Sequence, residues 1–281
     1  MRFLILLLTT IIIFNTNCHK NPDDPGEDSF VYPVATGNYW KYSREFIQFN
    51  IHPDSLKALP SDTLRGTSEV KVISKVSLSN STEAYMFLER LFENGKYIES
   101  NSYFNNHKNG FYLYAYSGNS SASPFKIAAG KRIYFNGYEF YNVRDIFSLI
   151  TEKSNYFLNS SDSIHYENPP LICLHYPIKV GVRWVYRVRG NPWLCEKKVI
   201  GEEVVKTPAG EFNCFIIKWL IDMDDNGEFD SNIEFFDYIS EKGLIIRSII
   251  IRGMILKDEK RKKLGSFDSK DEYVLTEYHL K

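Results

Sequence analysis

A repeated pattern of five residues places the strongest constraint on the fold of this chain. Tyr, Pro, Gly, Trp and Tyr recur with identical spacing in residues 32–42 and 176–186, at an offset of 144 residues. In each copy the proline favours an extended backbone, the glycine permits a tight turn, and Trp and Tyr two positions apart point to one face of a strand. An offset of this length is typical of two related halves and exceeds the period of a solenoid. We expect each copy to begin a β-unit with its aromatic rings in the core; contact of these rings with a ligand is the alternative.

The stretches that follow each copy have the pattern of antiparallel strands. Polar and apolar residues alternate or run apolar, and the connections carry turn dipeptides such as Asn94-Gly95 and Asn109-Gly110. The chain contains 19 Tyr and 20 Phe, which suit pleated, half-buried surfaces. The predicted fold class is mainly β: two related antiparallel meander units that form twisted, partly closed sheets, with at most one or two helices. The predicted strands are 68–76, 83–92, 97–104, 110–117, 184–188, 195–206, 211–222, 233–239, 244–256 and 272–280.

One segment between the two sets of strands has helical character. In residues 142–157, Asn142 is a candidate N-cap and Asp145 would lie in the first turn. An apolar stripe at helical spacing comprises Val143, Ile146, Phe147 and Ile150.

The predicted organisation of the whole chain is a signal peptide (1–17), an acidic tether (18–29), an N-terminal β unit (30–160) and a C-terminal β unit (161–281).

The first residues have the composition of an export signal. Arg2 precedes an apolar run over residues 3–14, which is too short to span a bilayer of ~30 Å as a helix. Cys18 follows directly, and this arrangement resembles that of bacterial lipoproteins, which carry lipid on such a cysteine. The resemblance implies an outer-membrane protein, lipid-anchored through Cys18, that faces the periplasm or the cell surface. Cleavage without lipidation and retention as an uncleaved anchor are the alternatives.

Charge and cysteine usage restrict the partners and the redox state. Without Arg2, 33 Lys and Arg face 35 Asp and Glu, a formal charge of −2, which gives no electrostatic reason to expect nucleic acid. The dense basic run at 257–263 is expected to be a solvated hairpin loop.

Beyond Cys18 the chain has Cys173, Cys195 and Cys214. A disulfide between Cys195 and Cys214 and burial of all three as small apolar residues are both open.

Part of the second half resembles the TapB-like family of uncharacterised bacterial envelope proteins. The resemblance lies in the turn and strand at Thr207-Pro208-Ala209-Gly210-Glu211-Phe212 and in the later strand at Gly243-Leu244-Ile245-Ile246. These motifs mark turns and carry no chemistry. The resemblance implies a twisted, partly closed antiparallel sheet and no known reaction.

One acidic loop has the spacing of a calcium site. The segment 222–230 fits D-x-D-x-N-G-x-x-D, with candidate ligands Asp222, Asp224, Asn226, Glu228 and Asp230. Calcium takes six to eight oxygen ligands, and Gly at the sixth position permits the sharp turn of such loops. Position 12 is Ile233, where a complete EF-hand loop has Glu. An acidic hairpin tip that binds no ion is the alternative, and any bound calcium is expected to stabilise the fold.

Motifs typical of enzymes are absent from the sequence. The chain has no G-x-S-x-G, H-E-x-x-H, Gly-rich phosphate loop or C-x-x-C. We therefore expect no enzyme, but an exported, lipid-anchored envelope protein that acts as a non-catalytic binding or structural module, with another envelope protein as a candidate partner. The first alternative is an envelope carrier or receptor that encloses a lipid or glycan in a cavity of a curved sheet. The second is an uncharacterised envelope enzyme.

Overall fold

The computed structural model describes residues 30–56, 63–79, 81–93, 95–118, 130–151, 164–187, 194–224 and 226–281. The predicted signal peptide, the lipidation site Cys18 and the acidic tether lie outside these residues. In the described part, no helix is both long enough and apolar enough to cross a membrane.

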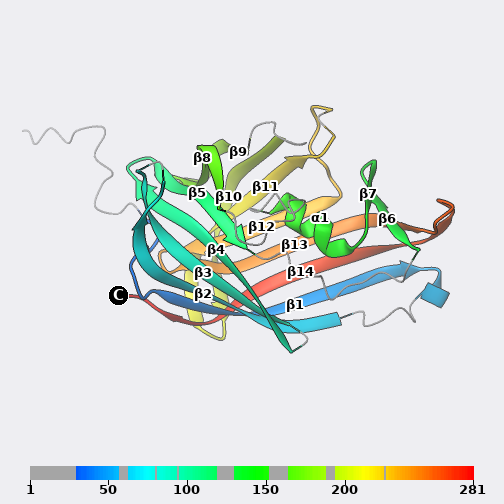
Figure 1. Ribbon diagram of the computed structural model, residues 1–281, viewed down its shortest axis with the longest axis horizontal. Coiled ribbons are helices and arrows are strands. Elements are labelled where there is room, and N and C mark those ends of the chain that lie inside the picture. Colours follow the sequence, from blue (N-terminus) through cyan, green and yellow to red (C-terminus); the bar gives the residue numbers. More distant parts are fainter. Residues whose placement is uncertain are drawn as a thin grey trace, which may run out of the picture.

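A single antiparallel sheet of 14 strands makes up most of the molecule (Figure 1). The elements are β1 (Tyr39–His52), η1 (Asp54–Leu56), β2 (Thr63–Ser77), β3 (Glu83–Glu93), β4 (Lys96–His107), β5 (Gly110–Gly118), β6 (Arg132–Phe135), β7 (Tyr138–Phe140), α1 (Val143–Ile150), β8 (His165–His175), β9 (Arg183–Arg187), β10 (Leu194–Thr207), β11 (Gly210–Asp222), β12 (Ile233–Ser240), β13 (Gly243–Lys257) and β14 (Lys263–His279). The predicted fold class, mainly β with antiparallel meanders and few helices, is confirmed.

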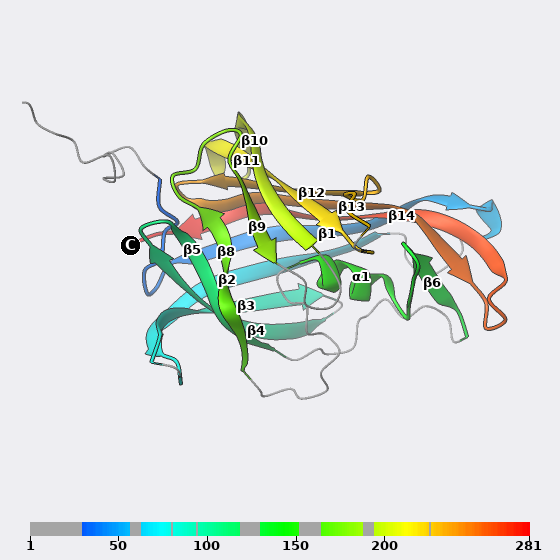
Figure 2. The ribbon, with the colours of Figure 1, turned by 90° about the horizontal axis from the view of Figure 1, so that it is seen from above.

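The strand order divides the sheet into two meanders of six strands. The first runs β1-β2-β3-β4-β5-β8 and the second runs β9-β10-β11-β12-β13-β14. The last strand of the second meander pairs with the first strand of the first, β14 with β1. The sheet curves until its two edge strands, β8 and β9, approach each other (Figure 2). The result is a nearly closed, barrel-like sheet with two junctions: the β1–β14 seam and the β8–β9 seam.

The two copies of the sequence repeat begin the two meanders with the same backbone geometry. The N–H of Gly37 donates to the carbonyl of Val72 at 2.8 Å, and the N–H of Gly181 donates to the carbonyl of Val199 at the same distance. Both glycines have positive φ, 97° and 91°, which a side chain would oppose. The strand that contains each valine, β2 or β10, has a register shift directly after it. The two copies of the sequence motif therefore share the same local backbone geometry.

The aromatic residues of the repeat are core residues, as the sequence predicts. Trp40 and Tyr42 are 0% and 3% exposed, and Trp184 and Tyr186 are 7% and 3% exposed. The indole N–H of Trp40 donates to the carbonyl of Lys242 at 2.6 Å, in the turn between β12 and β13.

The two motifs that resemble the TapB-like family form turns. Thr207 pairs with Gly210 across the β10–β11 turn, and Ser240 pairs with Gly243 across the β12–β13 turn. Gly243 has a φ of 105°, and a Cβ there would lie 2.9 Å from Nε1 of Trp40. This turn thus requires glycine because it packs directly on the first repeat.

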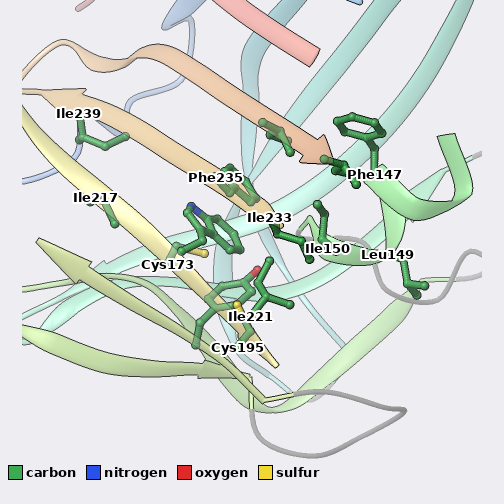
Figure 3. Close-up of a cluster of buried hydrophobic side chains, with 14 of the residues drawn as sticks. Phe147, Leu149, Ile150, Cys173, Cys195, Ile217, Ile221, Ile233, Phe235 and Ile239 are labelled. Carbon is green, nitrogen blue, oxygen red and sulfur yellow. The ribbon is translucent and has the colours of Figure 1, made fainter. Parts of the chain in front are cut away.

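The predicted segment 142–157 contains a helix over Val143–Ile150 with the predicted cap, and residues 152–157 lie outside the described residues. The Asn142 side chain accepts a hydrogen bond from the N–H of Asp145 at 3.0 Å, which satisfies one of the free amides of the first turn. The apolar stripe of α1 is buried, and Phe147 meets Phe46 of β1 edge to face at 5.6 Å. Figure 3 shows Ile150 of α1 directed toward Ile233 of β12. The helix therefore packs on the concave side of the sheet.

Several strands go beyond the sequence prediction. No strand was expected at β6, β7 or β8, and β14 begins at Lys263 rather than at residue 272. β8 pairs with β5, so it continues the first meander past residue 160, the predicted unit boundary. The basic run lies in the turn between β13 and β14, as expected.

Candidate functional site

The acidic loop between β11 and β12 is closed by its own backbone amides. Asp222 is 1% exposed, and its carboxylate accepts hydrogen bonds from the N–H groups of Asn226 at 3.2 Å and Gly227 at 2.9 Å. The Asn226 side chain accepts from the N–H of Glu228 at 2.7 Å. Such contacts from Asp and Asn to following amides stabilise turns without an ion.

The second carboxylate of the loop holds a neighbouring hairpin. Asp230 accepts from the N–H of Met223 at 2.8 Å and from the side-chain amide of Asn136 at 2.7 Å, in the β6–β7 turn. The hydroxyl of Tyr138 donates to the carbonyl of Met223 at 3.0 Å. Burial, together with the nearby carboxylates of Asp224 and Asp222, raises the pKa of Asp230, and the Met223 N–H opposes that rise. We call this set of contacts the loop brace, because it joins the β6–β7 hairpin to the second meander.

The remaining acidic candidates for calcium ligands lie at the surface of the loop. Asp224 and Glu228 are exposed. Among the described residues, no group of three or more His, Cys, Asp and Glu side chains is placed to hold a metal ion. Calcium binding by this loop stays a prediction.

The predicted disulfide between Cys195 and Cys214 is wrong. Cys195 lies opposite Ile221 and Cys214 lies opposite Glu203 in the β10–β11 ladder. Seven positions of β11 separate Cys214 from Ile221, which at ~3.3 Å per residue is roughly 23 Å, far beyond the ~7 Å limit between the Cα atoms of a disulfide. Both thiols are free and buried, and burial raises the pKa of each to about 12. The alternative, small buried apolar residues, is the one observed.

A row of charged side chains crosses the buried side of the second meander and continues onto β1. Arg44 and Asp271 form a bidentate pair with two distances of 2.7 Å, and each side chain is 5% exposed. Arg247 and Asp237 form a second bidentate pair at 2.7 and 3.0 Å. Asp237 also accepts from the indole N–H of Trp219 at 2.8 Å. These buried charges compensate one another, as burial requires.

Lys197 is the buried cation at the end of this row. It is 2% exposed, and its ammonium lies 3.7 Å from the ring centroid of Trp219 and 4.1 Å from that of Tyr186. The ammonium donates to the carbonyl of Cys173 in β8 at 3.2 Å. Lys197 on β10 therefore reaches across the β8–β9 seam.

Two further contacts close the same seam through side chains. The indole N–H of Trp184 donates to the carbonyl of Ile172 at 2.9 Å, and Arg187 pairs with Glu167 at 2.7 Å. In the described strands, no backbone ladder joins β8 to β9.

Sequence reasoning missed Lys197, Asp237, Arg247 and Asn136 as interacting residues. Only Asn136-Gly137, a turn dipeptide between apolar stretches, gave a local signal.

Comparison with known proteins adds only remote similarities. No protein-family model matches the chain, and no curated protein matches it. A candidate exported protein with a YmcC-like fold from Bacteroides fragilis matches with a TM-score of 0.35 and 12% identity, over 89% of this chain and 99% of that one. A candidate lipoprotein from Parabacteroides distasonis matches with a TM-score of 0.34 and 14% identity, over 89% and 99%. A beta-barrel-like protein with a domain of unknown function from Brucella abortus matches with a TM-score of 0.30 and 9% identity, over 88% and 99%.

Proposed function

We propose that this chain is an exported, lipid-anchored protein of the bacterial outer membrane that acts as a non-catalytic binding or structural module. The observation that carries the proposal is that the buried charged side chains of the charged row find their partners within the chain. Each buried charge there has its partner within the chain: Arg44 has Asp271, Arg247 has Asp237, and Lys197 has the Cys173 carbonyl. Buried charged side chains that are paired within the chain stabilise the fold. A partner would therefore bind to the exposed side chains.

The packing of the aromatic residues supports the same proposal. Trp219 stacks on Phe235 with centroids 4.2 Å apart and planes at 4°. Tyr32 stacks on Phe111 at 4.4 Å. Rings that stack on each other supply core stability, whereas a carrier would need such rings to line a cavity that its ligand fills.

Anchorage and location are the second part of the proposal. Cys18 would carry the lipid, the acidic segment to residue 29 would act as the tether, and the folded part would face the periplasm or the cell surface. The turns at Gly210 and Gly243 agree in position with the TapB-like motifs, and we include membership of that family in the proposal. Calcium at the acidic loop, if bound, would stabilise the β11–β12 connection.

Native mass spectrometry of the full chain, extracted from outer membranes in mild detergent, tests both parts. We expect an N-terminal peptide that begins at Cys18 and carries acyl chains, and a folded mass with no additional bound molecule. A Cys18→Ser variant should lose the acyl mass and leave the membrane fraction, with the fold unchanged by circular dichroism. A co-purified lipid or glycan that persists in the variant would favour the carrier instead, and an unmodified Cys18 would contradict the anchor.

A further inference from the structure

Three cations lie side by side on the outer face of β6, β13 and β14. In the strand register Lys257 is opposite Arg132 on one side and opposite Lys263 on the other. Their chain neighbours Ile133 and Leu256 are 0% and 2% exposed and point into the core, so Arg132 and Lys257 point outward. Lys263 is exposed. Like charges directly opposite each other destabilise a sheet. A local arrangement that costs stability in this way is typical of a functional surface.

Aromatic rings lie among these cations. The Lys257 ammonium lies 3.5 Å from the ring centroid of Tyr134, and the Arg132 guanidinium lies 4.2 Å from that of Tyr141. Tyr141 is 67% exposed, so its ring presents a flat apolar face to solvent. We call Arg132, Lys257, Lys263, Tyr134 and Tyr141 the tip surface.

Acidic side chains neutralise only part of the tip surface. Glu139 lies 3.6 Å from Arg132 and 3.8 Å from Arg261. One carboxylate is therefore paired with two guanidinium groups. Within the described residues, Lys257 and Lys263 take part in no ion pair. The sequence shows the run at 257–263 as a hairpin turn alone; the pairing of β6 with β13 adds Arg132 and the two rings to it. An anionic ligand is the complement of this surface.

The tip surface lies far from the point where the tether would begin. β14 runs 17 residues from Lys263 to His279, and His279 pairs with Tyr39 at the start of β1. At ~3.3 Å per residue this strand spans roughly 50 Å, whereas the 12 residues from Cys18 to Ser29 reach at most about 40 Å. Figure 1 shows β6 and the β13–β14 turn at the end of the molecule opposite to the C-terminus. The surface therefore faces away from the membrane that would hold the anchor.

We propose that the tip surface binds an acidic polysaccharide outside the anchoring membrane. Clusters of Lys and Arg bind polyanions such as heparin. Adjacent strands lie ~4.8 Å apart, so the three cations span about 10 Å and can meet successive charges of an extended polymer. The exposed Tyr141 ring offers a stacking face for a sugar ring. This inference rests on the proposed function only for export and anchorage.

The test is binding of the full chain, in nonionic detergent, to immobilised heparin as the acidic glycan probe. We expect R132A/K257A/K263A to raise the dissociation constant at least tenfold. The matched control is K71A/K179A/K198A, which removes three exposed lysines elsewhere and the same net charge; it should stay within twofold of the unmodified chain. The melting temperature of the tip variant should be unchanged or higher, because like-charge repulsion is removed. Heparin should raise the melting temperature of the unmodified chain and of the control only.

Three results would overturn the proposal. The first is equal weakening in both triple variants, which would show that net charge alone binds heparin. The second is the absence of heparin binding by the unmodified chain. The third is displacement of heparin, at equal charge concentration, by phosphatidylglycerol in mixed micelles or by single-stranded DNA, which would assign a membrane or a nucleic acid instead. Lipidation of Cys18 is measured separately, so failure of the anchor and failure of this surface give different results.

Discussion

The two junctions between the meanders are closed by different chemistry. At the β1–β14 seam a backbone ladder extends from Tyr39 paired with His279 to His52 paired with Ser266, and the buried Arg44–Asp271 pair reinforces it. At the β8–β9 seam, side chains of Trp184, Lys197 and Arg187 reach β8 without a ladder. The same repeat begins both flanking strands, β1 and β9, so the difference comes from what surrounds each copy.

The strands of the β8–β9 seam explain the difference. β8 contains Pro169 and Pro170, which lack the N–H that a ladder needs, and β9 has only 5 residues. Edge strands with such features resist pairing. Side-chain contacts can be removed one at a time, whereas a backbone ladder cannot. The β8–β9 seam should therefore open before the β1–β14 seam, and the predictions below test that order.

The largest expected effect is at the ladder seam. Asp271→Ala leaves Arg44 buried without its carboxylate, and loss of one partner of a buried pair costs about 3–5 kcal/mol in the free energy of unfolding. Glu167→Ala removes the carboxylate of the Arg187 pair, whose side chains are 15–16% exposed, and should cost less, about 1–3 kcal/mol. Urea denaturation of both variants measures the difference. The apolar double variant Arg44→Met/Asp271→Leu should recover most of the loss, and a larger cost for Glu167→Ala would reverse the comparison.

The two repeat tryptophans give the next contrast. Trp40→Phe and Trp184→Phe each remove one indole N–H donor, from the Lys242 carbonyl and the Ile172 carbonyl respectively. Each should cost about 1–3 kcal/mol, because a buried acceptor loses its partner. Hydrogen exchange separates them: Trp184→Phe should speed exchange along β8, and Trp40→Phe should speed it only at the β12–β13 turn. Equal changes along β8 in both variants would show that the seams are not independent.

The acidic loop between β11 and β12 tests a third connection, the contacts of Asp222 with the loop's own backbone amides. In chelator Asp222→Ala should cost about 1–3 kcal/mol, because the Asn226 and Gly227 amides lose their acceptor, whereas exposed Asp224→Ala should change stability by less than about 0.5 kcal/mol.

Calcium adds a separate arm to this experiment. Extracellular calcium sites have dissociation constants of roughly 10⁻⁴–10⁻³ M, and calcium at ten times that value would stabilise the fold by about 1.4 kcal/mol. A rise in melting temperature that both substitutions abolish would establish the site; no rise would leave the amide contacts of Asp222 as the role of that carboxylate.

The local parts of this fold could be predicted from the sequence, and the long-range parts could not. The Asn142 cap, the TPAG turn and the buried Trp40 and Trp184 follow from residue chemistry over a few positions, and all are observed. The pairing of β1 with β14 joins residues more than 200 positions apart, and no local pattern encodes it.

In the candidate site, too, the contacts between residues far apart in the sequence could not be predicted. The spacing predicts that Asp222 to Asp230 converge on an ion, and this stays a prediction. It gives no sign of the contact between Asp230 and Asn136, 94 residues away. Nothing in the sequence marks Lys197 as a buried lysine. In the structure its ammonium contacts the rings of Trp219 and Tyr186 and donates to the Cys173 carbonyl. The disulfide prediction failed for a related reason: consecutive strands suggested proximity, while the register sets Cys195 and Cys214 far apart.

Among the seam variants, Lys197→Met should have the smallest effect on stability, and it gives the most direct measure of seam opening. Loss of the hydrogen bond and of the ring contacts is offset by release of a buried charge, so the free energy of unfolding should change by no more than about 1 kcal/mol. Opening of the β8–β9 seam should nevertheless become more frequent, and Cys195, next to β9 in the ladder, reports it.

Thiol labelling at pH 8 detects that opening. Burial raises the pKa of Cys195 to about 12 from 9.0, so the closed thiol is almost unreactive, whereas about a tenth of an exposed thiol with the ordinary pKa is thiolate at that pH. The folded state keeps this proton between pH 9 and about 12; the stability that it contributes is complete below pH 9 and is lost as pH rises toward 12. At pH 8 the labelling rate therefore reports opening of the seam without shifting the folding equilibrium.

Cys195 should label faster than global unfolding allows, and faster still in Lys197→Met, while Cys214 labels at the rate of global unfolding in both chains. Cys173→Ser, Cys195→Ser and Cys214→Ser variants assign the labelling rates to the three thiols. Equal rates for Cys195 and Cys214 would mean that the β8–β9 seam opens only when the whole sheet unfolds.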